Sequence, residues 1–228
     1  MNRLSRITLD LARLHPSRVA QMIRNDGYEH HRLIWRLFPG SQEQPRDFLF
    51  RIDQERAFLR ALVLSERTPV DQDGTWRIET KSFTPRLRAG QRLEFSLRVN
   101  PVVTTRGADG RSSRHDVVMH AKKQAHDIGS GLEESESERV QRVANEWLNG
   151  RAERAGFSII AGSVNAERYL QHRLYRRRGV PPVRFSSVDL SGVLTVNDPG
   201  CLIGAITSGI GPCKAFGCGL LLIRPAVH

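Results

Sequence analysis

Apolar and polar side chains alternate in several short stretches of the chain, which is the pattern of a β-strand with one buried face. In residues 91–99, for example, an apolar residue occupies every second position and polar or charged residues lie between them. The same alternation, or a short apolar run, predicts further strands at residues 6–11, 47–53, 60–65, 76–83, 157–163, 183–196 and 220–223. The chain is therefore rich in strands along its whole length.

Helix signals lie between the predicted strands. Asp26 and Glu29 have the spacing of a capping box, so we expect a helix to start near Tyr28 and to stop at Pro39-Gly40. Asp198 before Pro199 predicts the start of a short helix over residues 201–208, which Gly209 ends. Two more helices are predicted at residues 17–24 and 132–148. Residues 104–115 are rich in Gly, Arg and Ser and are predicted to form an exposed, mobile loop.

Each half of the chain approximates the order strand–helix–strand–strand–helix–strand, clearly in the second half and irregularly in the first. This order is the ferredoxin-like motif. Residues 84–90, which contain Pro85 and end in a glycine, have the composition of a linker. We therefore predict an α+β protein of two tandem ferredoxin-like domains with antiparallel sheets. Residues 1–86 would form the N-terminal domain, which carries the helix predicted from Tyr28, and residues 91–228 would form the C-terminal domain.

Composition places the chain among ordinary globular proteins. It has 228 residues, of which 39% are hydrophobic and 26% charged, which excludes a disordered or fibrous chain. The three cysteines, Cys201, Cys213 and Cys218, form no CxxC pair, which argues against a disulfide scaffold or zinc finger and fits a reducing cytoplasm. No apolar run approaches the ~18 residues of a membrane span. We expect a soluble cytoplasmic protein with no membrane partner.

Charge is the first indication of function. Thirty-five Lys and Arg against 24 Asp and Glu give a formal net charge of +11, and the sequence pI is about 10.7. A domain pI above ~9 is typical of nucleic-acid binders. The excess lies in residues 81–124 and 157–228, and all but four of the cations are Arg, which forks phosphates and stacks on bases. Codon bias in a GC-rich genome explains the Arg:Lys ratio equally well, but it does not explain the net excess.

The helix predicted from Tyr28 carries candidate chemistry. Helical spacing places Tyr28 and His31 one turn apart on one face, whereas His30 points toward Ile34 and Leu37. The first turn of a helix also favours a phosphate. Imidazole, with a pKa near ~6.5, exchanges protons at cellular pH, and a phenol beside it can align a hydroxyl. Such a pair can cleave RNA through its own 2′-OH without a metal. Alternatively, both rings simply line the core.

A glycine-rich loop near the C-terminus is the second candidate. Residues 209–219 hold one lysine, Lys214, between four glycines: Gly209, Gly211, Gly217 and Gly219. Glycines let the backbone approach a phosphodiester closely, and Lys214 can neutralise its charge. The GK[ST] order of a Walker loop is missing, and the loop precedes a strand rather than a helix, which excludes a dinucleotide fingerprint. The alternative interpretation is a helix C-cap followed by a bulged strand.

A run of arginines at a predicted hairpin tip is the third candidate. The run spans residues 172–179 and suits an element that follows phosphates and stacks on bases, although a solvated charged tip is the simpler alternative. Its arginines are Arg173, Arg176, Arg177 and Arg178. His115, His120 and His126 lack Cys or carboxylate partners at a ligand spacing, so we predict no metal site.

Residues 28–39 (YEHHRLIWRLFP) and 46–51 (RDFLFR) resemble the N-terminal signature of the CasE family, the CRISPR-RNA endoribonucleases of the type I-E Cascade complex in the RAMP superfamily. Residues 97–101, 190–198 and 209–221 continue the resemblance in family order. The resemblance spans residues 4 to 224, and the combination of motifs is far more specific than any one of them.

The resemblance implies a RAMP/RRM-like tandem ferredoxin fold and cleavage of precursor CRISPR RNA without metal or small-molecule cofactor. The cut would lie at the 3′ base of a repeat hairpin stem and leave a 2′,3′-cyclic phosphate and a 5′-hydroxyl. The family's catalytic His falls on His31, its Tyr on Tyr28 and the lysine of its Gly-rich loop on Lys214. The implied partners are the CRISPR repeat RNA hairpin and the other Cascade subunits. Residues 104–115 and 173–178 lie where the family varies, so RNA contacts there are inferred from this sequence and not from the resemblance.

We therefore expect an endoribonuclease in which His31 acts as base on the 2′-OH or as acid to the leaving 5′-oxygen. Lys214 and backbone amides would stabilise the charged phosphorane. The leading alternative is a non-catalytic RAMP-type subunit that only caps the guide RNA, and the pairing of Tyr28 with His31 argues against it. A more distant alternative is a ribosome-associated RNA-binding protein with no preference for hairpins.

Overall fold

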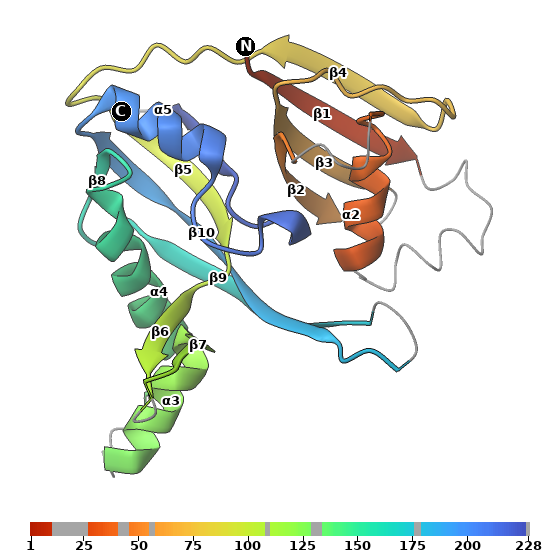
Figure 1. Cartoon of the computed structure of the whole chain (residues 1–228). Helices are drawn as coiled ribbons and strands as arrows, with labels where there is room; N and C mark the ends of the chain where they lie inside the picture. The colour runs from red at the N-terminus through yellow and green to blue at the C-terminus, as the bar shows by residue number, and fades with distance from the viewer. Residues whose placement is uncertain are drawn as a thin grey trace.

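The N-terminal sheet has four antiparallel strands in the order β2-β3-β1-β4, which is the ferredoxin-like order (Figure 1). Its strands are β1 (Arg3–Asp10), β2 (Phe48–Gln54), β3 (Phe58–Ser65) and β4 (Trp76–Ser82). The structure is a computed structural model that describes residues 1–10, 27–40, 46–54, 58–107, 110–128, 134–175 and 179–226. The predicted helix over residues 17–24 lies outside the described residues. So do Asp26 and the side chain of Glu29, which would form the predicted capping box.

The helix α2 (Gly27–Trp35) packs on one face of this sheet. Alternation in β2 puts Phe48, Phe50 and Ile52 on that face, where they form a buried cluster with Ile34 of the helix. The helix ends at Trp35, four residues before the predicted stop at Pro39. The second helix of the motif is missing, because residues 66–75 between β3 and β4 form only bends and irregular structure.

The C-terminal sheet repeats the same order, β11-β5-β10-β8, with β9 also paired to β10. Its strands are β5 (Arg92–Val99), β8 (Phe157–Ile159), β9 (Asn165–Leu174), β10 (Val183–Val196) and β11 (Leu221–Pro225). The helices α4 (Glu136–Ala152) and α5 (Pro199–Ser208) contribute to the buried cluster of this sheet. The α+β class with antiparallel sheets is thus confirmed. The domain limits 1–86 and 91–228 remain a prediction.

Helix caps fix where α4 and α5 begin. The Asp198 side chain accepts a hydrogen bond from the Cys201 backbone N–H, and Gly209 is the C-cap, so both predicted ends of α5 are confirmed. A capping box of Ser135 and Glu138 starts α4. This start lies a few residues after residue 132, where the sequence pattern predicts it.

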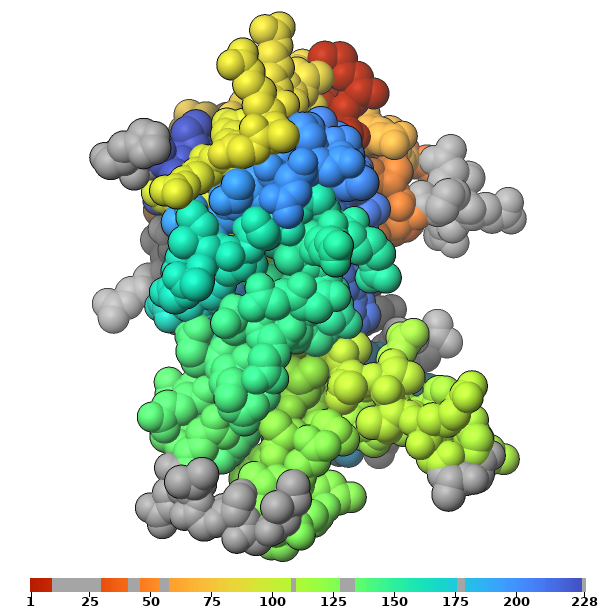
Figure 2. Space-filling model, turned by 90° about the vertical axis from the view of Figure 1, so that its left-hand side faces the viewer, coloured from red at the N-terminus to blue at the C-terminus, as the bar shows by residue number. Residues whose placement is uncertain are grey.

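Residues 104–115 do not form the expected loop. They belong to a hairpin of β6 (Val102–Arg106) and β7 (Ser112–Asp116), followed by an unexpected helix, α3 (Val117–Ile128). The hairpin is largely exposed and polar, so no alternation marks its strands. The strand β9 is equally polar and its sequence does not predict it, and β8 is shorter than predicted. Figure 2 shows the hairpin, α3 and α4 together on one face of the molecule.

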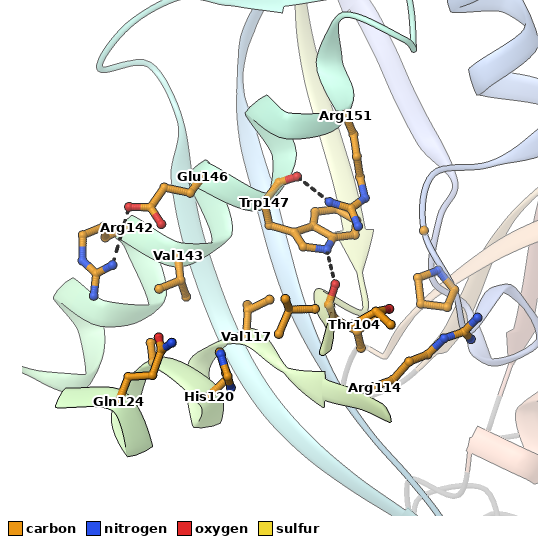
Figure 3. A pocket seen from close by; sticks show the side chains of 15 residues that line it. Thr104, Arg114, Val117, His120, Gln124, Arg142, Val143, Glu146, Trp147 and Arg151 are labelled. Atoms are coloured by element: carbon orange, nitrogen blue, oxygen red, sulfur yellow. Dashed lines mark hydrogen bonds and ion pairs between the residues drawn. The ribbon is translucent and has the colours of Figure 1, made fainter. Parts of the chain in front are cut away.

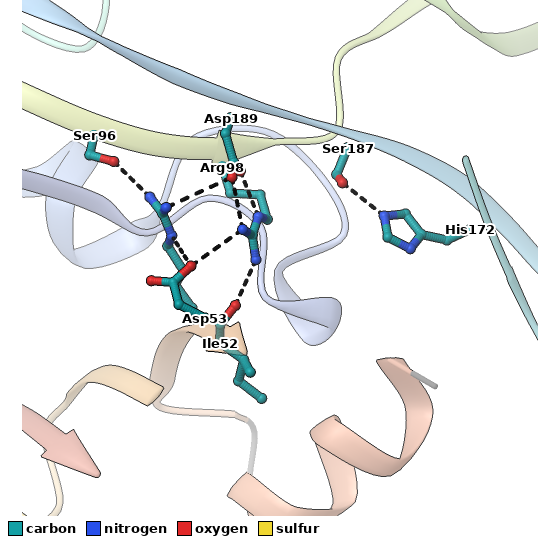
Figure 4. Close-up of polar contacts among 8 residues, drawn as sticks. Ile52, Asp53, Ser96, Arg98, His172, Ser187 and Asp189 are labelled. Carbon is teal, nitrogen blue, oxygen red and sulfur yellow. Dashed lines mark hydrogen bonds and ion pairs between the residues drawn. The ribbon is translucent and has the colours of Figure 1, made fainter. Parts of the chain in front are cut away.

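The two sheets meet through the second face of β2. Leu49 lies in the cluster of the C-terminal sheet, and Arg51 and Asp53 join a polar network across the boundary (Figure 4). At its centre Arg98 of β5 donates to both carboxylate oxygens of Asp189 of β10 at 2.6 and 2.8 Å and to the carbonyl of Ile52 at 2.8 Å. The network fixes the sheet that carries α2 against the sheet that carries the glycine-rich loop.

Candidate functional site

His31 lies where the N-terminal helix meets the glycine-rich loop. Its half-buried ring is 5.5 Å from the ring of Trp35 and 6.3 Å from that of Phe216, measured between centroids. Phe216 ends the short 3-10 helix η2 (Lys214–Phe216), which contacts α2. His31 and Lys214 therefore lie on two elements that pack against each other.

The neighbouring histidine is more deeply buried. His30 is buried, with 8% of its surface exposed, and lines a small cavity with Phe50 and Ile52 of β2. The burial of His30 agrees with the helical spacing, which predicts that His30 points toward Ile34 and Leu37. The backbone of Tyr28 lies in the first turn of α2. Its side chain is outside the described part of the structure, so its pairing with His31 stays a prediction.

The glycine-rich loop crosses from α5 to the N-terminal sheet, and η2 points toward α2 (Figure 1). Gly219 has a φ of +92°, and its backbone N–H donates to the carbonyl of Arg98 at 2.7 Å, while its own carbonyl accepts from Ile210 at 2.9 Å. A Cβ at Gly219 would lie 3.0 Å from the Ile210 carbonyl oxygen and 3.2 Å from the Lys214 side chain. Gly209 serves as the helix C-cap that the alternative interpretation expects.

Lys214 is partly buried in this loop, and its positive charge is destabilised there. Burial lowers the pKa of its amine, and the charge of Arg46 lowers that pKa further. Sequence analysis gave Arg46 no role, since it stands alone among the motif residues 46–51 without a pattern that indicates a ligand. The structure places it beside the candidate site.

A stack of three rings extends from the loop to the C-terminal sheet. Phe216 stacks on Phe185 at 5.2 Å, and Phe185 stacks on His172 at 4.5 Å. The Nε2 atom of His172 lies 2.8 Å from the hydroxyl of Ser187, and burial, with a further contribution from Arg98, lowers the pKa of the imidazole. These residues line the cavity that also contains His30, with a volume of about 160 Å³. Sequence analysis missed the stack because it depends on the pairing of His172 with Phe185 across β9 and β10.

The predicted arginine hairpin is formed by β9 and β10, which pair up to Leu174 and Val183. Arg173 is exposed, and its guanidinium lies 5.3 Å from the ring centroid of the exposed Tyr175. Arg176, Arg177 and Arg178 lie outside the described residues, so their contacts stay predicted. Figure 1 shows this hairpin extending away from the body of the C-terminal sheet.

Two adjoining hollows beside the loop are lined by further arginines. One, of about 690 Å³, contains Arg114, Arg173 and Arg184. The other, of about 740 Å³, lies between the β6–β7 hairpin, α3 and α4 (Figure 3). In it Arg151 stacks 3.8 Å above Trp147, whose indole N–H donates to the Val102 carbonyl at 3.1 Å. Both hollows are lined by Arg114 of β7 and by Pro212 of the glycine-rich loop. Together they form a continuous candidate interface for a polyanion.

Among the side chains that the structure describes, no group of three or more His, Cys, Asp or Glu residues is placed to hold a metal ion. His115 and His120 stack with centroids 5.9 Å apart. None of the described helices is long and apolar enough to cross a membrane.

A family model described as "CRISPR associated protein" matches residues 4–225. The chain belongs to this family. The resemblance to CasE stated from the sequence motifs is also confirmed, because the chain is 28% identical over 209 residues to the CRISPR system Cascade subunit CasE of Escherichia coli K12. That match covers 91% of this chain and 96% of the relative.

A second relative is named CRISPR-associated endoribonuclease Cse3, from Thermus thermophilus. It is 26% identical over 224 residues, covering 92% of this chain and 95% of the relative. Among solved structures, Cse3 bound to 19-nt RNA has a TM-score of 0.71 at 26% identity, covering 98% of this chain and 99% of that one. Cas6e from Escherichia coli K-12 has a TM-score of 0.58 at 25% identity, covering 98% and 100%. Both sheets therefore belong to a fold shared with this family.

Proposed function

We propose that this chain is a metal-independent endoribonuclease that binds CRISPR repeat hairpins and cleaves precursor CRISPR RNA at the 3′ base of the stem. The observation that carries the proposal is the packing of His31 against η2, which begins at Lys214. A relative along nearly the whole chain is named an endoribonuclease, and a similar structure with a TM-score of 0.69 is described as bound to an RNA representing a pre-cleavage complex. The protein would act in the cytoplasm as a Cascade subunit.

The proposed reaction uses the RNA's own hydroxyl. The 2′-OH loses its proton, its oxygen bonds to the adjacent phosphorus, and the bond from phosphorus to the 5′-oxygen breaks. The leaving oxygen gains a proton, which gives a 2′,3′-cyclic phosphate and a 5′-hydroxyl. His31 would take the first proton or supply the second, with Tyr28 aligning the reacting groups. One such proton transfer typically contributes about 10²- to 10⁴-fold.

RNA binding is proposed for the basic surface of the C-terminal half. Arg173 on the β9–β10 hairpin and the adjacent Arg176, Arg177 and Arg178 would follow the phosphates of the stem. The glycine-rich loop, with Gly209, Gly211, Gly217 and Gly219, would let the backbone approach the scissile phosphate, and Lys214 would stabilise its added charge. We propose that residues 1–86 form the domain that carries the catalytic helix, and that residues 91–228 form the domain that carries the basic hairpin and the glycine-rich loop.

The test is a cleavage assay with the wild-type protein and end-labelled repeat RNA in excess EDTA. We expect a single cut at the 3′ base of the hairpin and a product that ends in a 2′,3′-cyclic phosphate. The alternative of a non-catalytic subunit that caps the guide RNA predicts tight hairpin binding without any cut. Cleavage only after addition of Mg²⁺ would also contradict the proposal.

A further inference from the structure

Arg46 has an unsatisfied donor in a partly buried position. Its Nε atom is buried and has no hydrogen-bond partner among the described residues. Leaving such a donor unpaired costs free energy. The neighbouring Asp47 does not compensate it, because both carboxylate oxygens of Asp47 accept hydrogen bonds from Arg67, at 2.6 and 2.8 Å. Among the described residues, the Nε N–H of Arg46 therefore has no acceptor.

The start of β2 brings Arg46 to the place where α2 meets the glycine-rich loop. Phe48, two residues later, lies 5.3 Å from Trp35, whose ring contacts His31. The next two residues of the strand touch the loop: a Cβ at Gly209 would lie 3.0 Å from the Leu49 side chain, and one at Gly217 would lie 3.4 Å from the ring of Phe50. Arg46 thus lies two residues before a strand that touches both α2 and the glycine-rich loop.

Arg46 and Lys214 are two partly buried cations in this part of the structure. The charge of Arg46 is close enough to lower the pKa of the Lys214 amine, and burial lowers the pKa of both groups. Among the residues that the structure describes, no carboxylate lies within ion-pair distance of Arg46 or Lys214. Two partly desolvated positive charges repel each other, and a bound anion removes that cost. The two cations suit an anion that carries charged oxygens on more than one side, as a phosphate does.

We infer that Arg46 and Lys214 together form the binding site of the scissile phosphate, in which the Arg46 guanidinium donates to a non-bridging oxygen. This inference rests in part on the proposed function, which supplies a phosphodiester as the anion. Guanidinium is suited to this position because its fixed fork of donors matches phosphate oxygens. Its contribution grows as the phosphorane gains negative charge, so Arg46 acts on the rate more than on RNA affinity.

The first experiment needs no RNA. The chain contains only four lysines, so ¹³C-methylation of the lysines gives a simple NMR spectrum in which Lys214 can be titrated. Arg46→Ala should raise the pKa of Lys214 toward its ordinary value, because a neighbouring positive charge is removed. The control Arg77→Ala, on the distant edge strand β4, should leave it unchanged. Equal Lys214 titrations in all three proteins would overturn the paired site, whether or not the protein cleaves RNA.

The second experiment measures single-turnover cleavage of repeat RNA at saturating protein. Arg46→Ala should lower the rate by about 10²- to 10³-fold, as when one donor to a developing oxyanion is lost. RNA affinity and the melting temperature should change little, and Arg46→Lys should restore part of the rate. An unchanged rate would contradict the inference. A loss of rate that accompanies a loss of folding, and that Arg46→Lys does not rescue, would also contradict the inference. If the wild type itself does not cleave, the proposed function fails, and the titration alone decides the paired site.

Discussion

Burial is the main influence on the protonation of His172 at the edge of the candidate site. The ring stacks on Phe185 and is within 2.8 Å of the Ser187 hydroxyl. Burial, and to a lesser extent the charge of Arg98, lowers the pKa of this imidazole below its ordinary 6.5. The folded protein therefore holds His172 neutral at pH values where the unfolded chain binds a proton.

This difference makes stability depend on pH. The neutral His172 contributes stability above the unfolded pKa of 6.5, and the contribution is lost as the pH falls below it, because protons then favour the unfolded chain. His172→Gln should therefore flatten the curve of unfolding free energy against pH between about 5 and 7. Urea unfolding of the wild type and the variant at several pH values measures this pH dependence of the unfolding free energy. Parallel curves would show that His172 is not the group responsible.

Local patterns decide which single residues could be predicted. Helical spacing alone predicts different directions for His30 and His31. The structure buries His30 and leaves His31 half-buried, and both lie near Phe216. No local pattern marks Arg46 or His172, because their roles depend on residues far away in the sequence, Lys214 and Phe185.

Among the elements, the glycine-rich loop depends most strongly on its backbone geometry. Gly219 adopts a φ of +92°, and a Cβ there would lie 3.0 Å from the Ile210 carbonyl oxygen and 3.2 Å from the Lys214 side chain, so these neighbours would have to shift by a few tenths of an ångström. Gly90 has a similar φ of +80°, but a Cβ there would meet nothing within 4 Å. The two glycines therefore separate the cost of the backbone conformation from the cost of steric contact.

Gly90→Ala should destabilise the protein by about 1–2 kcal/mol, the cost of a left-handed conformation for a residue with a Cβ. Gly219→Ala should cost more and should also lower RNA cleavage at a temperature where the variant is folded, because Lys214 must move. Denaturant unfolding and a single-turnover assay measure the two effects. Equal losses of stability, with cleavage unaffected, would mean that the loop tolerates the contact.

Elements with a regular pattern on one face were predictable. The strands β5 and β10 pair over Leu190 and Leu97 with buried residues at alternate positions, and their limits lie within a residue of those expected. The β6–β7 hairpin and β9 are mostly exposed, so their sequences carry no alternation, and turn-like composition suggested a loop instead. Their pairing is set by tertiary structure.

At the scale of the whole molecule, the position of the site depends on how the two sheets are fixed to each other. Arg98 and Asp189 of the C-terminal sheet bind each other, and Arg98 also reaches the Ile52 carbonyl and Asp53 of the N-terminal sheet (Figure 4). The side chains of Arg98 and Asp189 are only 19% and 14% exposed. The contact between α2 and η2 relies on this junction, which no single motif in the sequence could reveal.

Asp189→Ala should therefore destabilise the protein by about 2–3 kcal/mol, because Arg98 keeps its charge in a partly buried place without its main partner. The matched control is Glu79→Ala, which breaks the exposed ion pair with Arg6 at 2.8 Å and should hardly change the unfolding midpoint. Urea unfolding compares them. Similar midpoints for the two variants would show that the junction does not depend on this network.

The central claim is that His31, and not its neighbour His30, moves a proton during cleavage. Single-turnover cleavage of repeat RNA in EDTA by His31→Ala and His30→Ala tests it most directly, with RNA affinity and folding checked for both proteins. We predict a loss of about 10²- to 10⁴-fold for His31→Ala at nearly unchanged RNA affinity, and a rate within about tenfold of wild type for His30→Ala. A wild-type rate in His31→Ala would contradict the account.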